Sequence, residues 1–249
     1  MNTPLVDKSP ERIRRMFGTI AHRYDLINRL LTLGIDGVWR KSTARILLNA
    51  DTIEGDVLDV CCGTGELSFA FLKQQQKIQS ERKNYGIDFS PEMIAVAQRK
   101  AKGNSNLCFT VGDALELPFE ENRFAVAAAA FGLRNVCDTQ RGLAEIVRVC
   151  KPGGLIALLD FSMPTLPIVR HCYQFYFHIF LPRLGQWFAK NQDQAYHYLP
   201  ESVLQFEQPR QLAEHLTQLG ITDIRIKPMT CGIVSLIWGR KMSAVSTCE

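Results

Sequence analysis

The sequence lacks the features that mark several protein classes. It contains no stretch of 18 consecutive apolar residues, so no transmembrane helix is expected, and its first 15 residues hold no apolar segment like that of a secretory signal. The eight cysteines form no C-x-x-C pair, which argues against a zinc or dithiol redox site, and no metal site is predicted. These absences favour a reducing, cytoplasmic location with free thiols.

The charge is small and unevenly distributed. A net charge of +4, from 29 basic and 25 acidic residues, is too weak to indicate a nucleic-acid partner. Residues 1–50 carry nine Lys or Arg and four Asp or Glu, a balance of +5, which leaves −1 for the other 199 residues. This basic segment predicts peripheral contact with an anionic membrane surface or a partner, and the alternative is a solvated helix face.

The order of apolar runs predicts an α/β fold. A composition of 46% hydrophobic and 22% charged residues is typical of a globular chain, and we expect one domain over 1–249. Strands that alternate with helices predict a parallel, doubly wound sheet. The last two strands stand too close together for a crossover helix and should be antiparallel. The expected strands are 57–60, 85–88, 107–111, 124–131, 155–160, 221–227 and 232–239, and the expected helices within this pattern are 66–75, 93–102 and 140–150.

Two segments stand outside the alternating pattern. Residues 9–50 form an N-terminal helical extension, with one segment of helical periodicity that ends at Gly34 and a second near 38–48. Residues 163–200 form an aromatic-rich insertion, because 171–198 holds nine of the 23 aromatic residues. The insertion is interpreted as the wall of a groove for an apolar ligand or as a contact with the bilayer interface, and the alternative is ordinary helix core.

A glycine-rich turn follows the first expected strand. Asp59 ends that strand, and Gly63, Thr64 and Gly65 lead into the helix expected at 66–75. Glycines at this place allow a tight turn and a close approach of the backbone to a ligand. The turn alone is weak support, because nicotinamide-dependent enzymes share it and a plain turn can look the same.

Acidic residues follow the next two expected strands. Asp88 ends the second, where a carboxylate can accept both hydroxyls of a ribose. Asp113 follows the third, where a carboxylate can accept from an amine such as the adenine amino group. Each acid alone can be a cap or turn residue. Together with Asp59 they place three acids at the ends of successive strands and predict a nucleoside-containing ligand there.

Two residues favour S-adenosylmethionine over a dinucleotide. The dinucleotide fingerprint requires a third glycine where Ser68 stands. Asp59 suits the amino-acid portion of a ligand, whereas a pyrophosphate prefers helix N–H groups with no negative charge nearby. The antiparallel pair expected at the end of the chain agrees with this choice.

Several motifs resemble those of one enzyme family. The turn at 59–65, the acids Asp88 and Asp113 and the segment 151–154 resemble a class I S-adenosylmethionine-dependent methyltransferase. The segments 24–28, with Gly34 and 39–40, and 131–136, with 148–154, resemble the two signatures of the menaquinone/ubiquinone C-methyltransferase family, and 196–202 is similar to a further family segment. The resemblance covers about residues 10–240. The sequence departs from the family pattern at Thr32, Asp36, Ala130 and Asp160, of which Asp36 and Ala130 put local contacts in question.

The resemblance implies a fold, a reaction and a set of site residues. The fold is a Rossmann-like, seven-stranded, mostly parallel sheet with an antiparallel last strand. The reaction is methyl transfer from S-adenosyl-L-methionine to a ring carbon of a reduced polyprenyl quinone, first of all demethylmenaquinol. The implied cofactor-binding residues are Asp59, Gly63, Thr64, Gly65, Asp88, Asp113, Ala114 and Ala130, and the implied catalytic residues are Arg134, Asn135, Tyr24 and Asp25.

The catalytic candidates have distinct expected roles. Arg134 can stabilise a phenolate and lower the pKa of the quinol, and Asn135 can bond a quinol oxygen. Tyr24 and Asp25 can close over the site and relay a proton. The alternative is an ordinary surface Arg–Asp pair with a packed tyrosine. A quinol dissolved in lipid further implies peripheral contact with the inner face of a membrane, and a homodimer is also an expectation.

Three other functions stay open at this point. The substrate can instead be a ubiquinone precursor or a phytyl naphthoquinol, which the sequence does not separate. A nicotinamide-dependent oxidoreductase is the alternative from another class, disfavoured by Asp59 and Ser68. A non-catalytic scaffold of the quinone pathway is the third.

Overall fold

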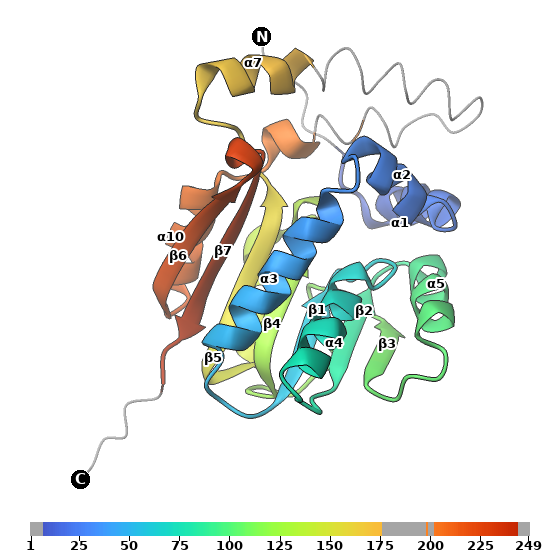
Figure 1. Cartoon of the computed structure of the whole chain (residues 1–249), viewed down its shortest axis with the longest axis vertical. Coiled ribbons are helices and arrows are strands. Elements are labelled where there is room, and N and C mark those ends of the chain that lie inside the picture. The colour runs from blue at the N-terminus through green and yellow to red at the C-terminus, as the bar shows by residue number, and fades with distance from the viewer. Residues whose placement is uncertain (1–6, 176–197, 199–201, 244–249) are drawn as a thin grey trace.

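A computed structural model describes residues 7–175, 198 and 202–243. Within these ranges the chain builds a seven-stranded sheet of order β3-β2-β1-β4-β5-β7-β6 (Figure 1). Strand β7 is antiparallel to both of its neighbours, and the other six strands run parallel to one another, as expected. The strands are β1 (Asp56–Val60), β2 (Asn84–Asp88), β3 (Leu107–Val111), β4 (Phe124–Ala130), β5 (Cys150–Phe161), β6 (Ile221–Met229) and β7 (Val234–Lys241).

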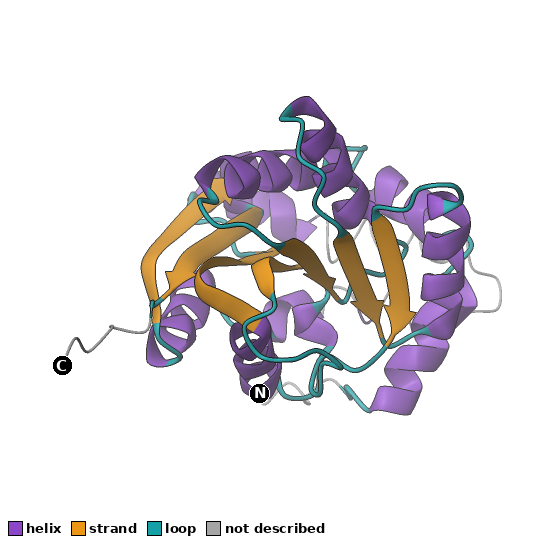
Figure 2. Ribbon diagram, turned by 90° about the horizontal axis from the view of Figure 1, so that it is seen from below, coloured by secondary structure: helices purple, strands orange, loops and turns teal. Residues whose placement is uncertain are grey.

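Helices cover both faces of the sheet (Figure 2). Helices α3 (Asp36–Ala50), α4 (Glu66–Lys77) and α5 (Pro91–Ala101) pack on one face. Helices α6 (Thr139–Val149) and α10 (Pro209–Gln218) pack on the other. Helix α10 was not expected from the sequence. In the described ranges no helix combines the length and apolarity needed to cross a bilayer.

The alternation of side chains along the central strands divides the core into two layers. Val57 and Val126 face α3 and α4, whereas their neighbours Leu58 and Ala127 face α6 and α10. Strand β4 reads FAVAAAA and is buried on both faces up to Ala129, as a central parallel strand should be. Its small side chains let helices on both faces approach closely.

The N-terminal extension differs from its expected form. The periodic segment ending at Gly34 is two helices, α1 (Pro10–Ile20) and α2 (Tyr24–Leu31), separated by a tight turn. The N–H groups of Ala21 and Arg23 bond the carbonyls three residues earlier, which ends the α-helical pattern. Because Ala21 is only 2% exposed, the turn is anchored in the core. Periodicity alone could not show this break, since the apolar spacing continues through it.

Strand β5 starts earlier than expected. It begins at Cys150 instead of 155, so the 151–154 segment lies inside the strand as an irregularity. Phe124 pairs with Cys150 and Val126 pairs with Leu155. The single residue between them on β4 therefore stands opposite four residues on β5, 151–154. Gly153 takes a φ of +78° and makes this bulge possible.

The predicted aromatic insertion at 163–200 is described only in part. It contains α7 (Pro167–Phe175) and Tyr198, whereas 176–197 and 199–201 lie outside the described residues. The expectation that this segment forms a groove therefore falls largely on residues for which no structure is given.

Candidate active site

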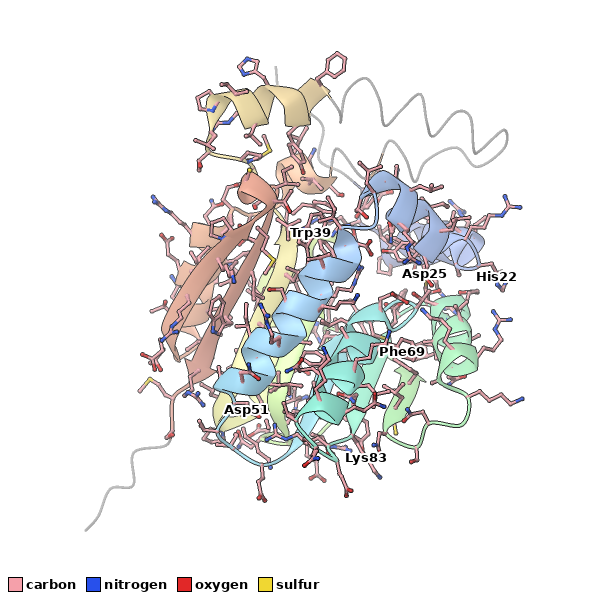
Figure 3. All side chains as sticks on the ribbon, in the orientation of Figure 1. His22, Asp25, Trp39, Asp51, Phe69 and Lys83 are labelled. Carbon is pink, nitrogen blue, oxygen red and sulfur yellow. The ribbon has the colours of Figure 1, made fainter. Side chains whose placement is uncertain are left out.

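A cleft of about 1040 Å³, including its open mouth, lies at the carboxyl-terminal edge of the parallel strands. Figure 3 marks this end of the molecule by Asp25 and Trp39 and the opposite end by Asp51 and Lys83. Ligands of open α/β sheets bind at this edge. Nine of the twelve predicted site residues line the cleft, and Asp25, Gly65 and Arg134 do not. The nine are Tyr24, Asp59, Gly63, Thr64, Asp88, Asp113, Ala114, Ala130 and Asn135.

The turn after β1 needs its glycines. Gly63 and Gly65 have φ values of +55° and +86°, a region that other residues occupy at a cost. A Cβ on Gly65 would lie 2.7 Å from Cζ of Phe109, so this glycine also makes room for a side chain of β3. Cys61 takes a φ of +56° without being glycine, which places a strained residue where the strand meets the cleft.

Asp59 is buried, and in the described part of the chain only one of its two carboxylate oxygens has a hydrogen-bond donor. Its Oδ2 accepts bonds from the N–H and the hydroxyl of Ser68 at 2.9 and 2.7 Å, and among the described residues its Oδ1 has no partner. Burial raises the pKa of Asp59 to about 7. A buried carboxylate oxygen that lacks a donor and lines a cleft is suited to a ligand ammonium. Ser68, noted in the sequence only as a missing glycine, is thus the residue that orients Asp59.

Asp88 is hydrogen-bonded to the glycine-rich turn after β1. Its Oδ2 accepts the N–H of Gly63 at 2.8 Å and its Oδ1 accepts the N–H of Ser90 at 2.9 Å. Burial raises its pKa. Each oxygen keeps a lone pair, so the carboxylate can also accept ribose hydroxyls.

Asp113 and Ala114 follow β3 on the same side of the cleft. The Oδ1 atom of Asp113 accepts the N–H of Leu115 at 2.9 Å, which holds the loop in a turn. Asp113 is exposed and Ala114 is buried. Asp59, Asp88 and Asp113 thus all line the cleft, at or just beyond the ends of β1, β2 and β3.

The two cysteines of the turn are unsuited to nucleophilic chemistry. Burial raises the pKa of the Cys61 and Cys62 thiols well above the usual value, and the nearby carboxylates raise it further. Both thiols are therefore protonated at neutral pH. A role as small packing residues beside the cleft is therefore favoured for both.

The segment after β4 holds a buried ion pair. Nη1 of Arg134 donates to Oδ1 of Asp160 at 2.7 Å and to the carbonyl of Phe131 at 2.5 Å. Arg134 is 4% exposed, so its guanidinium fixes the chain between β4 and β5 and does not line the cleft. Burial raises the pKa of Asp160, and the charge of Arg134 opposes that rise.

Asn135, the next residue, does reach the cleft. Its Oδ1 accepts the hydroxyl of Tyr198 at 3.0 Å, which joins the segment after β4 to a residue from the far side of the aromatic insertion. Burial raises the pKa of Tyr198 to about 12. The phenol therefore stays protonated at neutral pH and acts as the donor.

Helix α2 is tied to the glycine turn. Oδ1 of Asp25 accepts the hydroxyl of Thr64 at 2.5 Å, and its Oδ2 accepts from Nζ of Lys100 at 3.1 Å. Lys100 also donates to the carbonyl of Thr64 at 3.0 Å and so connects α5 to the same point. Tyr24 lines the cleft, whereas Asp25 is not among its lining residues and links α2 to the turn.

Sequence reasoning missed several cleft residues. Ile13 and Phe17 of α1 supply an apolar wall, and Lys8 and Arg40 supply the positive charges. Arg40 is 8% exposed and its Nη1 donates to Oδ2 of Asp36 at 2.5 Å. A signal for this pair was present, since an acid four residues before an arginine on a helix predicts an ion pair.

A comparison with protein-family models finds one match over nearly the whole chain. Residues 5–241 match the model described as the ubiE/COQ5 methyltransferase family. The chain belongs to this family. The sequence-based assignment to a family of quinone C-methyltransferases is thereby confirmed, and with it the assignment as an enzyme that uses S-adenosylmethionine.

Curated relatives cover the chain almost completely. It is 43% identical over 235 residues to a ubiquinone/menaquinone biosynthesis C-methyltransferase of Citrifermentans bemidjiense, covering 93% of this chain and 97% of the relative. It is 34% identical to a demethylmenaquinone methyltransferase of Staphylococcus saprophyticus, with the same two coverages. Its identity to a demethylmenaquinone methyltransferase of Staphylococcus aureus is 35%, covering 93% of each chain.

Solved structures confirm the fold. A methyltransferase of Aquifex aeolicus that depends on S-adenosylmethionine has a TM-score of 0.55 at 18% identity, over 79% of this chain and 88% of that one. A phosphoethanolamine N-methyltransferase of Haemonchus contortus, in complex with S-adenosylhomocysteine, has a TM-score of 0.56 at 15% identity, over 81% and 53%. The expected class I methyltransferase fold is therefore correct.

Proposed function

We propose that this enzyme methylates a ring carbon of a reduced polyprenyl quinone, with demethylmenaquinol as its substrate. The observation that carries the proposal is the family match over residues 5–241, joined to relatives named for this substrate. The cleft supports it with an apolar wall from α1 together with the acids at the ends of β1 and β2. Such a mixed cleft suits a prenylated ring beside a polar methyl donor.

S-adenosylmethionine supplies an electrophilic methyl group when it is bound. Asp88 would hold the ribose hydroxyls, and Asp113 with Ala114 would face the adenine. Asp59, through the oxygen that Ser68 leaves without a donor, would bind the ammonium. Gly63 and Thr64 would let the ligand approach the backbone of the turn. These residues determine where the methyl group points, and positioning of this kind can contribute about 7–11 kcal/mol to catalysis at best.

The residues after β4 would prepare the quinol. Loss of a phenolic proton makes the neighbouring ring carbon nucleophilic. Tyr198 donates to Oδ1 of Asn135, so the amide nitrogen of Asn135 is the group left to donate to a quinol oxygen. Arg134 is buried beneath the cleft lining and would not touch the quinol. Its positive charge would favour the phenolate form of the quinol through the electrostatic field alone.

Tyr24 and Asp25 would close the cleft from α2. Tyr24 lines it, and Asp25 holds Thr64 and Lys100 so that α2 stays seated on the glycine turn. A proton relay through these two residues stays a prediction. The contacts of Asp25 support a positioning role more directly than contact with the substrate.

The quinol is soluble in lipid, so we further propose peripheral contact with a membrane at the cleft end of the molecule. Leu33, Ile168 and Phe175 are 86%, 81% and 61% exposed there, next to α2 and on α7 (Figure 1). Leu33→Asp should reduce co-sedimentation with anionic phospholipid vesicles, and equal sedimentation would contradict this contact. A homodimer and a cytoplasmic location stay predictions.

The experiment that tests the proposed function offers the enzyme two acceptors. One is a chemically reduced demethylnaphthoquinol and the other a benzoquinol with the same prenyl tail, each given with labelled S-adenosylmethionine. Label in the naphthoquinol alone is the expected result. Label in the benzoquinol alone would replace the substrate by a ubiquinone precursor, and label in neither would refute a quinol substrate.

A further inference from the structure

The charge of the cleft is incomplete for the ligand that it is proposed to hold. The amino-acid end of S-adenosylmethionine is a zwitterion, with a carboxylate beside the ammonium. Asp59 suits the ammonium but repels the carboxylate, since like charges in a buried site cost free energy. A cation that faces this end of the ligand would offset that repulsion. Among the described residues that line the cleft, Lys8 and Arg40 are the cations.

The surroundings of the two cations separate them. Lys8 interacts electrostatically with Glu207 and with the Arg134–Asp160 pair, whose members lie after β4 and in β5. The two hydrogen bonds from Ser68 and, more weakly, the guanidinium of Arg40 hold the pKa of Asp59 below the value that burial alone would give. Arg40 is thus the cleft cation that acts on Asp59, the residue proposed for the ligand ammonium, and Asp59 is not among the groups that act on Lys8.

Arg40 is held ready at this place. It projects from α3, which packs over β1 and β4 through Trp39, and its guanidinium carbon lies 5.0 Å from the centre of the Phe131 ring. Asp36 accepts from one of its nitrogens, and the hydroxyl of Thr32 donates to the other oxygen of Asp36. One nitrogen is used by this pair, and a guanidinium has five N–H groups. The remaining donors include enough for a two-pronged bond to a carboxylate.

We propose that Arg40 binds the carboxylate of the methionine portion of the methyl donor, so that Arg40 and Asp59 together recognise a free amino acid. The inference rests on the proposed binding of S-adenosylmethionine and adds the group by which the enzyme selects it. Asp36 positions Arg40 and compensates its positive charge. This pairing reduces the cost of burying the guanidinium while the cleft is empty. The departure at Asp36 from the usual family residue thereby has a physical role in this chain.

The test compares two ligands that differ in the carboxylate alone. One is S-adenosylhomocysteine and the other its decarboxylated counterpart, S-adenosyl-3-thiopropylamine, and both are titrated calorimetrically into the full chain. The wild-type protein is expected to bind the first about 10- to 100-fold more tightly, the range of one charge-assisted carboxylate interaction. The double variant Asp36→Asn with Arg40→Gln should bind the two ligands within about threefold of each other, because it removes both members of the ion pair at once.

Two further variants make the result specific. Lys8→Gln removes the other cation of the cleft and should leave the preference for the carboxylate as in the wild type. Arg40→Lys keeps the positive charge but loses the planar guanidinium that can donate two parallel bonds, so it should show an intermediate preference. If the double variant does not fold, Arg40→Lys takes its place in the comparison. A preference that survives loss of Arg40, or that disappears with Lys8, overturns the inference and leaves the proposed function intact. Failure of the wild-type protein to bind either ligand refutes the proposed function itself.

Discussion

The unusual pKa of Asp59 leads to a pH dependence of ligand binding. Burial raises this pKa from 3.8 to about 7, so half of the empty protein carries a protonated Asp59 at that pH. A ligand ammonium pairs with the ionised form alone, and binding must therefore release the proton. The ionised fraction is about 0.09 at pH 6 and about 0.76 at pH 7.5, which predicts about eightfold weaker binding of S-adenosylhomocysteine at the lower pH.

The variant Asp59→Asn tests this reasoning. Asparagine can still accept from Ser68 through its oxygen, but it lacks the charge, so binding at pH 7.5 should weaken about 10-fold or more. Calorimetry at both pH values measures the two effects together. Burial also raises the pKa of Asp88, but this residue is unchanged in both proteins, so the difference between them isolates Asp59. An equal pH slope in wild type and variant would refute the assignment.

The same shift has a consequence for stability. The folded chain binds the proton of Asp59 more tightly than the unfolded chain, because the folded pKa is about 7 and the ordinary value is 3.8. The contribution is therefore fully favourable below pH 3.8 and is lost as the pH rises to 7. Asp59→Asn should remove this loss and raise the melting temperature at pH 8, whereas an unchanged or lower value would contradict the burial argument.

Three further predictions concern the frame of the cleft. Gly65→Ala should lower the free energy of unfolding by about 2–4 kcal/mol, because it adds backbone strain and a clash with Phe109. Gly103 has a similar φ but open space around it, so Gly103→Ala should lower the free energy of unfolding by only about 1 kcal/mol. Chemical denaturation measures both values. Arg134→Met should cost about 3–5 kcal/mol by stranding Asp160, and adding Asp160→Leu should restore part of it; no recovery would contradict the pairing. Tyr198→Phe should lower kcat and leave binding of S-adenosylhomocysteine unchanged, and weakened binding would contradict its place beside the acceptor.

The sequence predicted the elements whose signals are local. Alternating apolar runs placed the strands of the sheet, and the short gap before β7 correctly indicated an antiparallel pair. The three acids at successive strand ends also follow from local sequence, because strand ends of a parallel sheet share one edge. The extra turn at Ala21 and the early start of β5 were missed, since neither changes the apolar spacing from which they would be read.

Contacts between distant segments were beyond the sequence. Nothing in the spacing shows that Thr64 donates to Asp25 or that Tyr198 reaches Asn135, because those pairs are 39 and 63 residues apart. Motif reasoning named Arg134 as a substrate contact, but burial against Asp160 takes its guanidinium out of the cleft lining. Arg40 shows the reverse case, since a residue known only from a signature proves to line the cleft.

The most direct test of the central claim is to find where the transferred methyl group resides. The full chain is given reduced demethylnaphthoquinol and S-adenosylmethionine carrying a ¹³C methyl group, and the oxidised product is examined by NMR. A methyl signal on the quinone ring carbon next to a carbonyl is the predicted result. A methyl signal on oxygen, or an unlabelled quinone recovered while S-adenosylhomocysteine still binds, would contradict carbon methylation of this substrate.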